Sequence, residues 1–324
     1  MTRCVLAAVA SVWLGLAATP VAAQIVAVPA SPRAEQAARN AEQAMKDAER
    51  ITALAAGQLS DPRMATATTP EAFAALVEPR RADLAAARTE VQAIRDRLLA
   101  MPPAARPSDP PQMRLVDQTV LDVARMAGQI DDLMANALGV ADGVKEGDRA
   151  KVSRSIIAVA TGTVVLTQAQ AVALRAKAAT LDEGTSNRAQ LAGLACLSEG
   201  IAAFQQGLLG MAERPAAAVA IRAAQACTVR EVASGRAALD RETAPAVGGA
   251  AVQRFAVQYE ELSADVFDQL DRGSLTLGQA AESVERGASV RDVVANEFVV
   301  FQDVMTRVQR ISAQQAAAQA AQMD

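Results

Sequence analysis

Histidine is absent from all 324 residues of the sequence. This absence excludes Ser-His and Cys-His nucleophiles, zinc sites with imidazole ligands, histidine-ligated haem and the carboxylate–histidine di-iron set of helical bundles. The chain also lacks the GxxxxGK[ST] phosphate loop, the GxSxG nucleophile elbow and the CxxCH haem-attachment motif. We therefore expect a protein that is not an enzyme and that holds no cofactor and no metal. An enzyme of an unrecognised type is a lesser alternative.

Aromatic residues are scarce, at 2% of the chain, with one tyrosine and one tryptophan. With so few aromatic rings, we expect no surface on which sugars or nucleobases could stack. The net charge is −4 and the chain has no basic run, so we expect no binding of nucleic acid. Apolar residues still make up 51% and charged residues 21%, which is a globular composition. Alanine, leucine and valine must form the core, and with so much alanine the fold class is all-α.

The N-terminus has the pattern of a signal peptide over residues 1–23. Arg3 precedes an uncharged apolar run from Val5 to Ala18, and Pro20 and three small residues follow it. The run of 14 residues is shorter than the roughly 20 that a bilayer requires, so we expect Sec-type cleavage after Ala23. The excess of arginine over lysine is typical of a GC-rich bacterial genome. The predicted location is periplasmic or secreted.

Apolar residues recur three and four positions apart along most of the chain, which predicts an elongated antiparallel bundle of seven or eight helices. Five prolines in residues 102–111 interrupt any helix and mark a linker. The predicted domains are an N-terminal helical hairpin (24–101), a main bundle (112–311) and an Ala/Gln-rich tail (312–324). Within the main bundle, we expect Gly273-Ser274 to end the seventh helix and a short helix to follow.

The fourth helix, which begins after Asp148, carries no charge between Arg154 and Arg175. A transmembrane span is one interpretation of this stretch. Serine, threonine and glutamine are interspersed along it, however, so we expect a core helix that is buried nearly all round. The prediction is that no stable membrane span remains after signal cleavage.

Two cysteines, Cys196 and Cys227, lie at equal distances from a turn predicted at residues 211–215. In an antiparallel hairpin they would face each other, and an exported protein meets conditions in which thiols oxidise. A disulfide requires Cα atoms near 5.5 Å, closer than the usual 8–10 Å between helix axes, so small neighbours are needed. The predicted disulfide is accompanied by a close-packing stripe of small residues: Gly193, Gly200, Ala203, Gly207 and Gly210 before the turn, and Ala220 and Ala224 after it.

The glycine line, Gly193, Gly200 and Gly207, repeats every seven residues and has two interpretations. It could mark close contact between helices, or it could border a groove for an apolar ligand. Paired carboxylates give no further candidate site, because Asp131-Asp132 and Glu260-Glu261 each follow a core residue and are predicted to point outward. The segment "DGVKEGD" (142–148) is predicted to be a capped turn between helices.

These observations favour an exported non-enzymatic protein that acts as a scaffold or binds unknown partner proteins through helix faces. The alternative is a helical bundle that binds a small apolar ligand or lipid, which the glycine line and the charge-free helix suggest.

Overall fold

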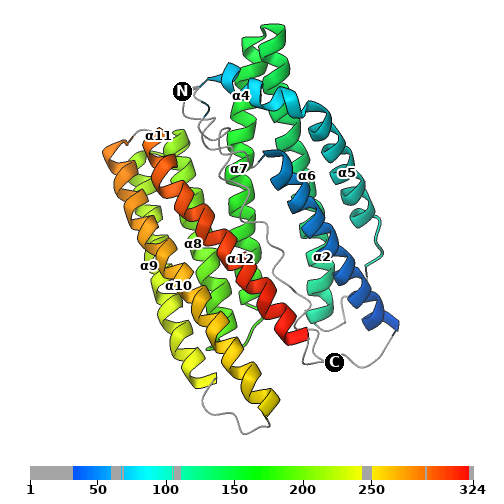
Figure 1. Cartoon of the computed structure of the whole chain (residues 1–324), viewed down its shortest axis with the longest axis vertical. Helices are drawn as coiled ribbons and strands as arrows, with labels where there is room; N and C mark the ends of the chain where they lie inside the picture. The colour runs from blue at the N-terminus through cyan, green and yellow to red at the C-terminus, as the bar shows by residue number, and fades with distance from the viewer. Residues whose placement is uncertain are drawn as a thin grey trace. The chain divides into compact units, whose positions relative to one another are not determined.

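The computed structural model of the protein describes residues 32–59, 67, 69–103, 105, 111–242, 250–288 and 290–320 (Figure 1). Within these ranges the chain forms an all-α bundle with eight long helices and no strand, so the predicted fold class is confirmed. The predicted signal peptide (1–23) and most of the proline linker lie outside the described residues.

The chain divides into two compact units, and the division falls between Thr163 and Val164, inside helix α7 (Arg149–Ala178). The sequence placed the boundary at 102–111 instead. The difference arises because α6 (Pro111–Glu146), the helix after the linker, packs against the helices that precede the linker. A proline-rich segment therefore ends the helices on either side of it without separating their hydrophobic cores.

The first unit contains α2 (Pro32–Leu59), α4 (Pro70–Val77), the 3₁₀ turn η3 (Glu78–Arg80) and α5 (Arg81–Leu99). Helices α2, α4 and α5 each pack against α6, and η3 joins α4 to α5. Helix α4 begins after Thr69, whose hydroxyl accepts a hydrogen bond from the Ala72 amide. The helix restarts at η3, which contains Pro79. The core is mostly alanine and aliphatic side chains, with Phe73 fully buried.

Two aspartates are buried between the helices of this unit. Asp47 of α2 accepts hydrogen bonds from Arg97 of α5, the shorter at 2.5 Å, and Asp131 of α6 accepts one at 2.8 Å from Arg88. The prediction that Asp131 points outward is wrong: it is 7% exposed. The Asp131 side chain faces α5, where Arg88 compensates its charge. The neighbouring Asp132 is exposed, as predicted.

The turn between α6 and α7 has the predicted capping. Gly147 adopts a left-handed conformation (φ 67°), and the Asp148 side chain accepts a hydrogen bond from the Lys151 amide. Among the described residues α7 is the one helix long and apolar enough to cross a membrane, yet only 44% of its most apolar window is buried. The expectation of nearly all-round burial is wrong, because Ile157, Val165 and Val172 are exposed.

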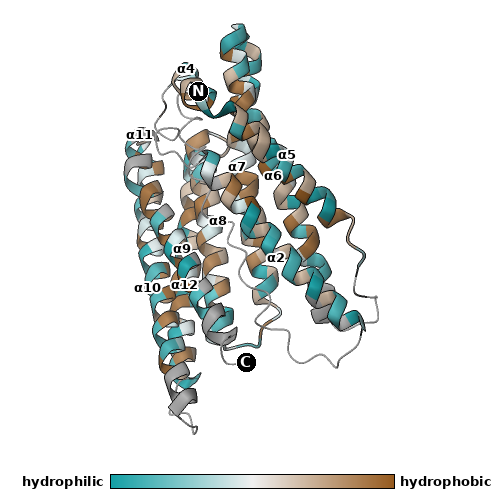
Figure 2. Ribbon diagram, turned by 45° about the vertical axis from the view of Figure 1, so that its right-hand side comes forward, coloured by the Kyte–Doolittle hydropathy of each residue, from teal (hydrophilic) through white to brown (hydrophobic). Residues whose placement is uncertain are grey.

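The second unit continues with α8 (Ser186–Leu209), α9 (Arg214–Glu242), α10 (Ala250–Arg286), α11 (Val290–Val293), the π-helical segment η4 (Val294–Phe298) and α12 (Val299–Ala320). Figure 1 shows α8, α9, α10 and α12 running side by side. Hydrophilic and hydrophobic residues alternate along α10 (Figure 2), as expected of a helix that packs on one side only.

Helix α10 is continuous through the predicted break at Gly273-Ser274, so that expectation is wrong. Both of its internal glycines meet another helix. A Cβ added at Gly273 would lie 2.9 Å from a Leu197 methyl group, and one at Gly278 would lie 2.8 Å from the Gln225 side chain. These glycines allow close packing rather than a turn, and α10 ends before Gly287, which adopts the left-handed conformation (φ 66°).

Candidate functional site

A disulfide joins Cys196 of α8 to Cys227 of α9, as predicted, with the Cα atoms 5.8 Å apart. The two helices form a hairpin, and the turn begins at Gly210, which has a φ of 67°. Gly210 was assigned to the close-packing stripe, and this is wrong: a Cβ there would meet nothing within 4 Å. The glycine instead ends α8, because the left-handed backbone disfavours residues with a side chain.

The glycine line of α8 is occupied by side chains of α10. A Cβ added at Gly200 would lie 2.6 Å from Leu277, and the equivalent distances are 3.0 Å from Gly193 to Leu270 and 3.1 Å from Gly207 to Val284. The side chains from α10 also repeat every seven residues, so each enters the space that a glycine leaves open. These contacts support the close-contact interpretation of the glycine line rather than an apolar groove.

The hairpin partner α9 supplies alanines to the same contact. The Cβ of Ala224 would lie 3.1 Å from a Cβ at Gly200, and that of Ala217 would lie 2.8 Å from one at Gly207. Ala203 and Ala224 are buried, in agreement with their place in the stripe. Ala220 is exposed, so it lies at the edge of the contact between α8 and α9 rather than inside it, beside a surface hollow.

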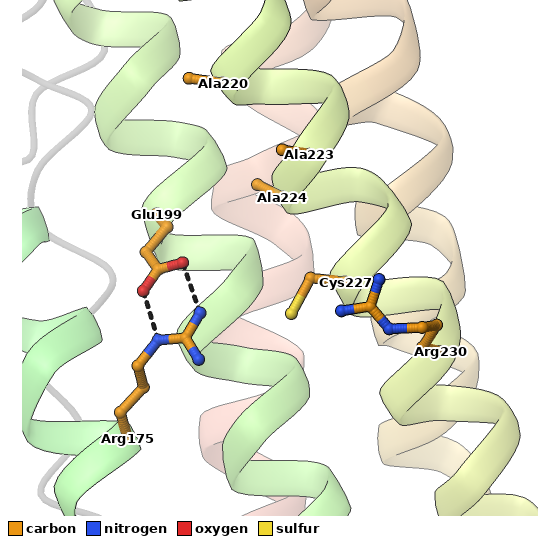
Figure 3. Close-up of a pocket in the computed structure, with 7 residues that line it drawn as sticks. All are labelled: Arg175, Glu199, Ala220, Ala223, Ala224, Cys227 and Arg230. Carbon is orange, nitrogen blue, oxygen red and sulfur yellow. Dashed lines mark hydrogen bonds and ion pairs between the residues drawn. The ribbon is translucent and has the colours of Figure 1, made fainter.

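A surface hollow of about 430 Å³ lies beside the disulfide (Figure 3). We call it the α9 hollow, and it is lined by Arg175 of α7, Glu199 of α8, and Ala220, Ala223, Ala224, Cys227 and Arg230 of α9. All of these residues belong to the second unit. Small side chains form its floor, and charged side chains stand around it.

The charged side chains around the α9 hollow differ in their pairing. Arg175 donates two hydrogen bonds to the Glu199 carboxylate, one from Nε and one from Nη2 (Figure 3). The second has a length of 2.6 Å. The hydrogen bonds to Glu199 raise the pKa of Arg175. The negative charges of Glu199 and Glu231 raise this pKa further, whereas desolvation by burial lowers it. Arg230 makes no ion pair with any described residue.

The two sulfur atoms of the disulfide have unequal access to the hollow. Cys196 is 0% exposed, whereas Cys227 is half-buried and lines the hollow. Arg175 Nη2 also donates a hydrogen bond to Cys196 Sγ at 3.8 Å. Cys227 can therefore be approached from the hollow, whereas Cys196 is buried and in contact with a cation.

Most residues around the hollow were not singled out from the sequence. Ala220, Ala223, Cys227 and Arg230 follow one another at spacings of three and four, so their common face could have been found from the helical period. The pairing of Arg175 with Glu199 depends on how α7 and α8 pack, which no local pattern indicates. Elsewhere in the unit, Glu297 is a buried carboxylate that accepts a 2.6 Å hydrogen bond from Ser283.

The arrangement offers a shallow, cationic surface rather than a catalytic centre of known type. Within the described ranges no group of three or more histidine, cysteine, aspartate or glutamate side chains could hold a metal ion. Comparison with protein-family models, with curated proteins and with solved structures finds no match.

Proposed function

We propose that this chain is an exported protein that binds a partner protein through the outer face of α9. We define this face by the exposed residues Ala216, Val219, Ala220, Ala223 and Ala226, together with Cys227 and Arg230. The observation that carries the proposal is the exposure of a continuous alanine–valine surface, on which Val219 is 66% exposed. The face extends for roughly 20 Å at 1.5 Å per residue.

The charges on α9 support this choice of face. Arg222 and Arg236 both point toward α10, where they pair with Glu285 and with Asp268 and Asp271. Arg230 stands on the outer face without such a partner among the described residues. The face therefore presents small apolar side chains and one available cation.

The partner that fits this surface is an amphipathic helix with small or apolar side chains and a carboxylate placed against Arg230. Small residues allow two helix backbones to approach closely, as they do between α8 and α9. A carboxylate at one end would fix the orientation of the partner helix through a charge-assisted hydrogen bond. The small-ligand alternative has less support, because α10 fills the glycine line that suggested it.

Export is the second part of the proposal. The pattern of residues 1–23 supports it, and the disulfide is compatible with an oxidising compartment. Detection of the chain outside the cytoplasm, with Gln24 at its N-terminus by mass spectrometry, is the expected result. Recovery of the chain from the cytoplasm with residues 1–23 retained would contradict export.

The binding proposal can be tested by placing a photo-reactive amino acid at Ala223 in the native cells. The control position is Val257, which is 55% exposed on α10. We expect irradiation to give one discrete protein adduct from Ala223 and none from Val257, and we expect Val219→Asp to abolish it. The melting temperature of Val219→Asp should match that of wild type. Absence of an adduct at Ala223, or an adduct that survives Val219→Asp, would refute the docking face.

A further inference from the structure

We infer that the disulfide is a site of exchange with anionic low-molecular-mass thiols, and that these form a mixed disulfide with Cys227. The inference concerns the disulfide itself and holds whether or not α9 binds a partner protein. It rests on the unequal access to the two sulfurs, on the contact of the buried one with Arg175, and on the position of Arg230 beside the hollow (Figure 3).

The first step of the argument is which sulfur can be attacked. Exchange begins when a thiolate attacks one sulfur of a disulfide, so the rate depends on access to that sulfur. Cys227 lines the α9 hollow, whereas Cys196 is 0% exposed. The small side chains of Ala220, Ala223 and Ala224 leave the approach to Cys227 open. The incoming thiol is thereby directed to one cysteine of the pair.

The second step is the leaving group. The thiolate RS⁻ forms a new bond to Cys227 Sγ, the Cys196–Cys227 bond breaks, and its electron pair goes to Cys196 Sγ. The products are RS–S–Cys227 and a Cys196 thiolate, so one disulfide replaces another and no external oxidant is needed. Arg175 Nη2 already donates to Cys196 Sγ at 3.8 Å, and a cation in this place stabilises a thiolate.

The third step is the chemistry of the thiol. The hollow of about 430 Å³ is open to solvent, so a small thiol can approach Cys227 without displacing a side chain larger than alanine. Arg230 can bind a carboxylate, since it has no ion-pair partner among the described residues. Arg175 already donates to Glu199 and to Cys196, and Glu231 acts on the same guanidinium, so Arg230 is the group that binds the anion of the incoming thiol.

The site of reaction can be determined with the oxidised full chain and reduced glutathione. The exchange is run on the folded protein and quenched with N-ethylmaleimide in denaturant, which alkylates any free thiol including the buried Cys196, and the products are mapped by peptide mass spectrometry. We expect glutathione on Cys227 and N-ethylmaleimide on Cys196 in the folded protein. Glutathione on Cys196, or no reaction until denaturant is added, would overturn the inference.

The role of Arg230 can be tested by comparing two thiols. Arg230→Gln should slow the reaction with glutathione by about twofold to fivefold, as expected for one exposed ion pair, and leave the reaction with neutral 2-mercaptoethanol unchanged. The matched control is Arg222→Gln, which removes another exposed arginine of α9, one that pairs with Glu285 of α10. It should change neither rate. Equal effects of Arg230→Gln on both thiols, or none on either, would overturn the selection of anionic thiols.

The role of Arg175 has a separate readout. Arg175→Gln should slow exchange with both thiols and shift the alkylation of Cys196 in the reduced protein to higher pH, because the thiolate loses its cation. Arg175→Lys, which keeps the charge, should restore part of the rate. An unchanged pH profile in Arg175→Gln would show that Arg175 does not stabilise the leaving thiolate.

Discussion

The two units of the molecule use different contacts to hold alanine-rich helices together. In the unit that ends at Thr163, carboxylates enter the interior: the Asp47 and Asp131 side chains are 5% and 9% exposed in their pairs with arginines of α5. In the unit that begins at Val164, arginine–carboxylate pairs also join helices, but their carboxylates are exposed, as in Glu199 and Glu285 at 41% each. There α8, α9 and α10 meet through glycines, alanines and a disulfide, and the buried carboxylate of Glu297 is bound by Ser283 rather than by an arginine.

This difference shows two ways to give specificity to a core with few aromatic side chains. A buried aspartate costs desolvation, yet it fixes which helices meet because without its arginine it would be an uncompensated buried charge. A glycine inside a helix costs up to about 1 kcal/mol relative to alanine, yet it admits a leucine of the next helix at one register only. The predictions below test whether each device stabilises its own unit.

Removal of the disulfide is expected to have the largest effect. The loop between the cysteines spans 31 residues, for which the chain-entropy relation predicts a loss of about 3–4 kcal/mol. We expect Cys196→Ser combined with Cys227→Ser to lower the free energy of unfolding by this amount in urea. Hydrogen exchange should accelerate in α8 and α9 more than in α5 and α6. Equal acceleration in all four helices would mean that the units unfold together.

Gly200→Leu should be the next most damaging change. The new side chain would collide with Leu277, whose methyl carbons lie 2.6 and 2.7 Å from the Cβ position, and overpacking of this kind costs about 1–3 kcal/mol. The matched control is Gly57→Ala, where a Cβ meets nothing within 4 Å and stability should stay equal or rise by up to about 1 kcal/mol. An unchanged urea midpoint for Gly200→Leu would mean that the glycine line is not packed.

Asp131→Asn tests the buried pair of the first unit. The substitution keeps the size of the side chain but removes the charge that Arg88 compensates, and we expect a loss of about 1–2 kcal/mol. Asp132→Asn is the matched control: this neighbour is exposed, and its effect should stay within about 0.5 kcal/mol. Equal effects of the two substitutions in urea unfolding would show that the buried pair contributes no specific stability.

Lys177→Met should have the smallest effect and a distinct pH dependence. Desolvation by burial lowers the pKa of Lys177 from 10.5 to about 8. Between these values the unfolded state binds more protons than the folded state, so this lysine makes stability rise with pH across that window. Lys177→Met should remove this rise in stability between about pH 8 and pH 10.5.

The control for this pH dependence is Lys145→Met, at an exposed position, which should leave the profile unchanged. Thermal melts at several values between pH 7 and pH 10 supply the comparison. If the rise between pH 8 and pH 10 persists in Lys177→Met, another group titrates in this window.

Much of the local structure could be predicted from the sequence because its causes are local. Thr69 and Asp148 accept hydrogen bonds from the first turn of the helix that follows each, and the two cysteines lie at the same height in the hairpin. Errors occurred where a residue has two possible roles. A glycine can end a helix, as Gly210 does, or continue it against a neighbouring side chain, as Gly273 does.

The candidate site was largely unpredicted for the same reason. Cys227 and the stripe residues Ala220 and Ala224 were named, but the sequence alone could not show that all three line a surface hollow and that Arg175 reaches Cys196 there. The start of helix α7 and the turn of the hairpin were predicted, from the cap at Asp148 and from residues 211–215. The sequence did not predict which side of each of these helices would be covered. A helix with apolar residues on two sides gives no signal for the side that remains exposed.

The sequence by itself determined the all-α class, the caps of α4 and α7 and the pairing of Cys196 with Cys227, since helix propensity, capping and hairpin register act over short distances. Only the tertiary structure decided that α10 continues through Gly273 and that Asp131 is buried against Arg88. The physical reason is that steric fit and desolvation depend on the residue that arrives from another helix, and that residue lies far away along the chain.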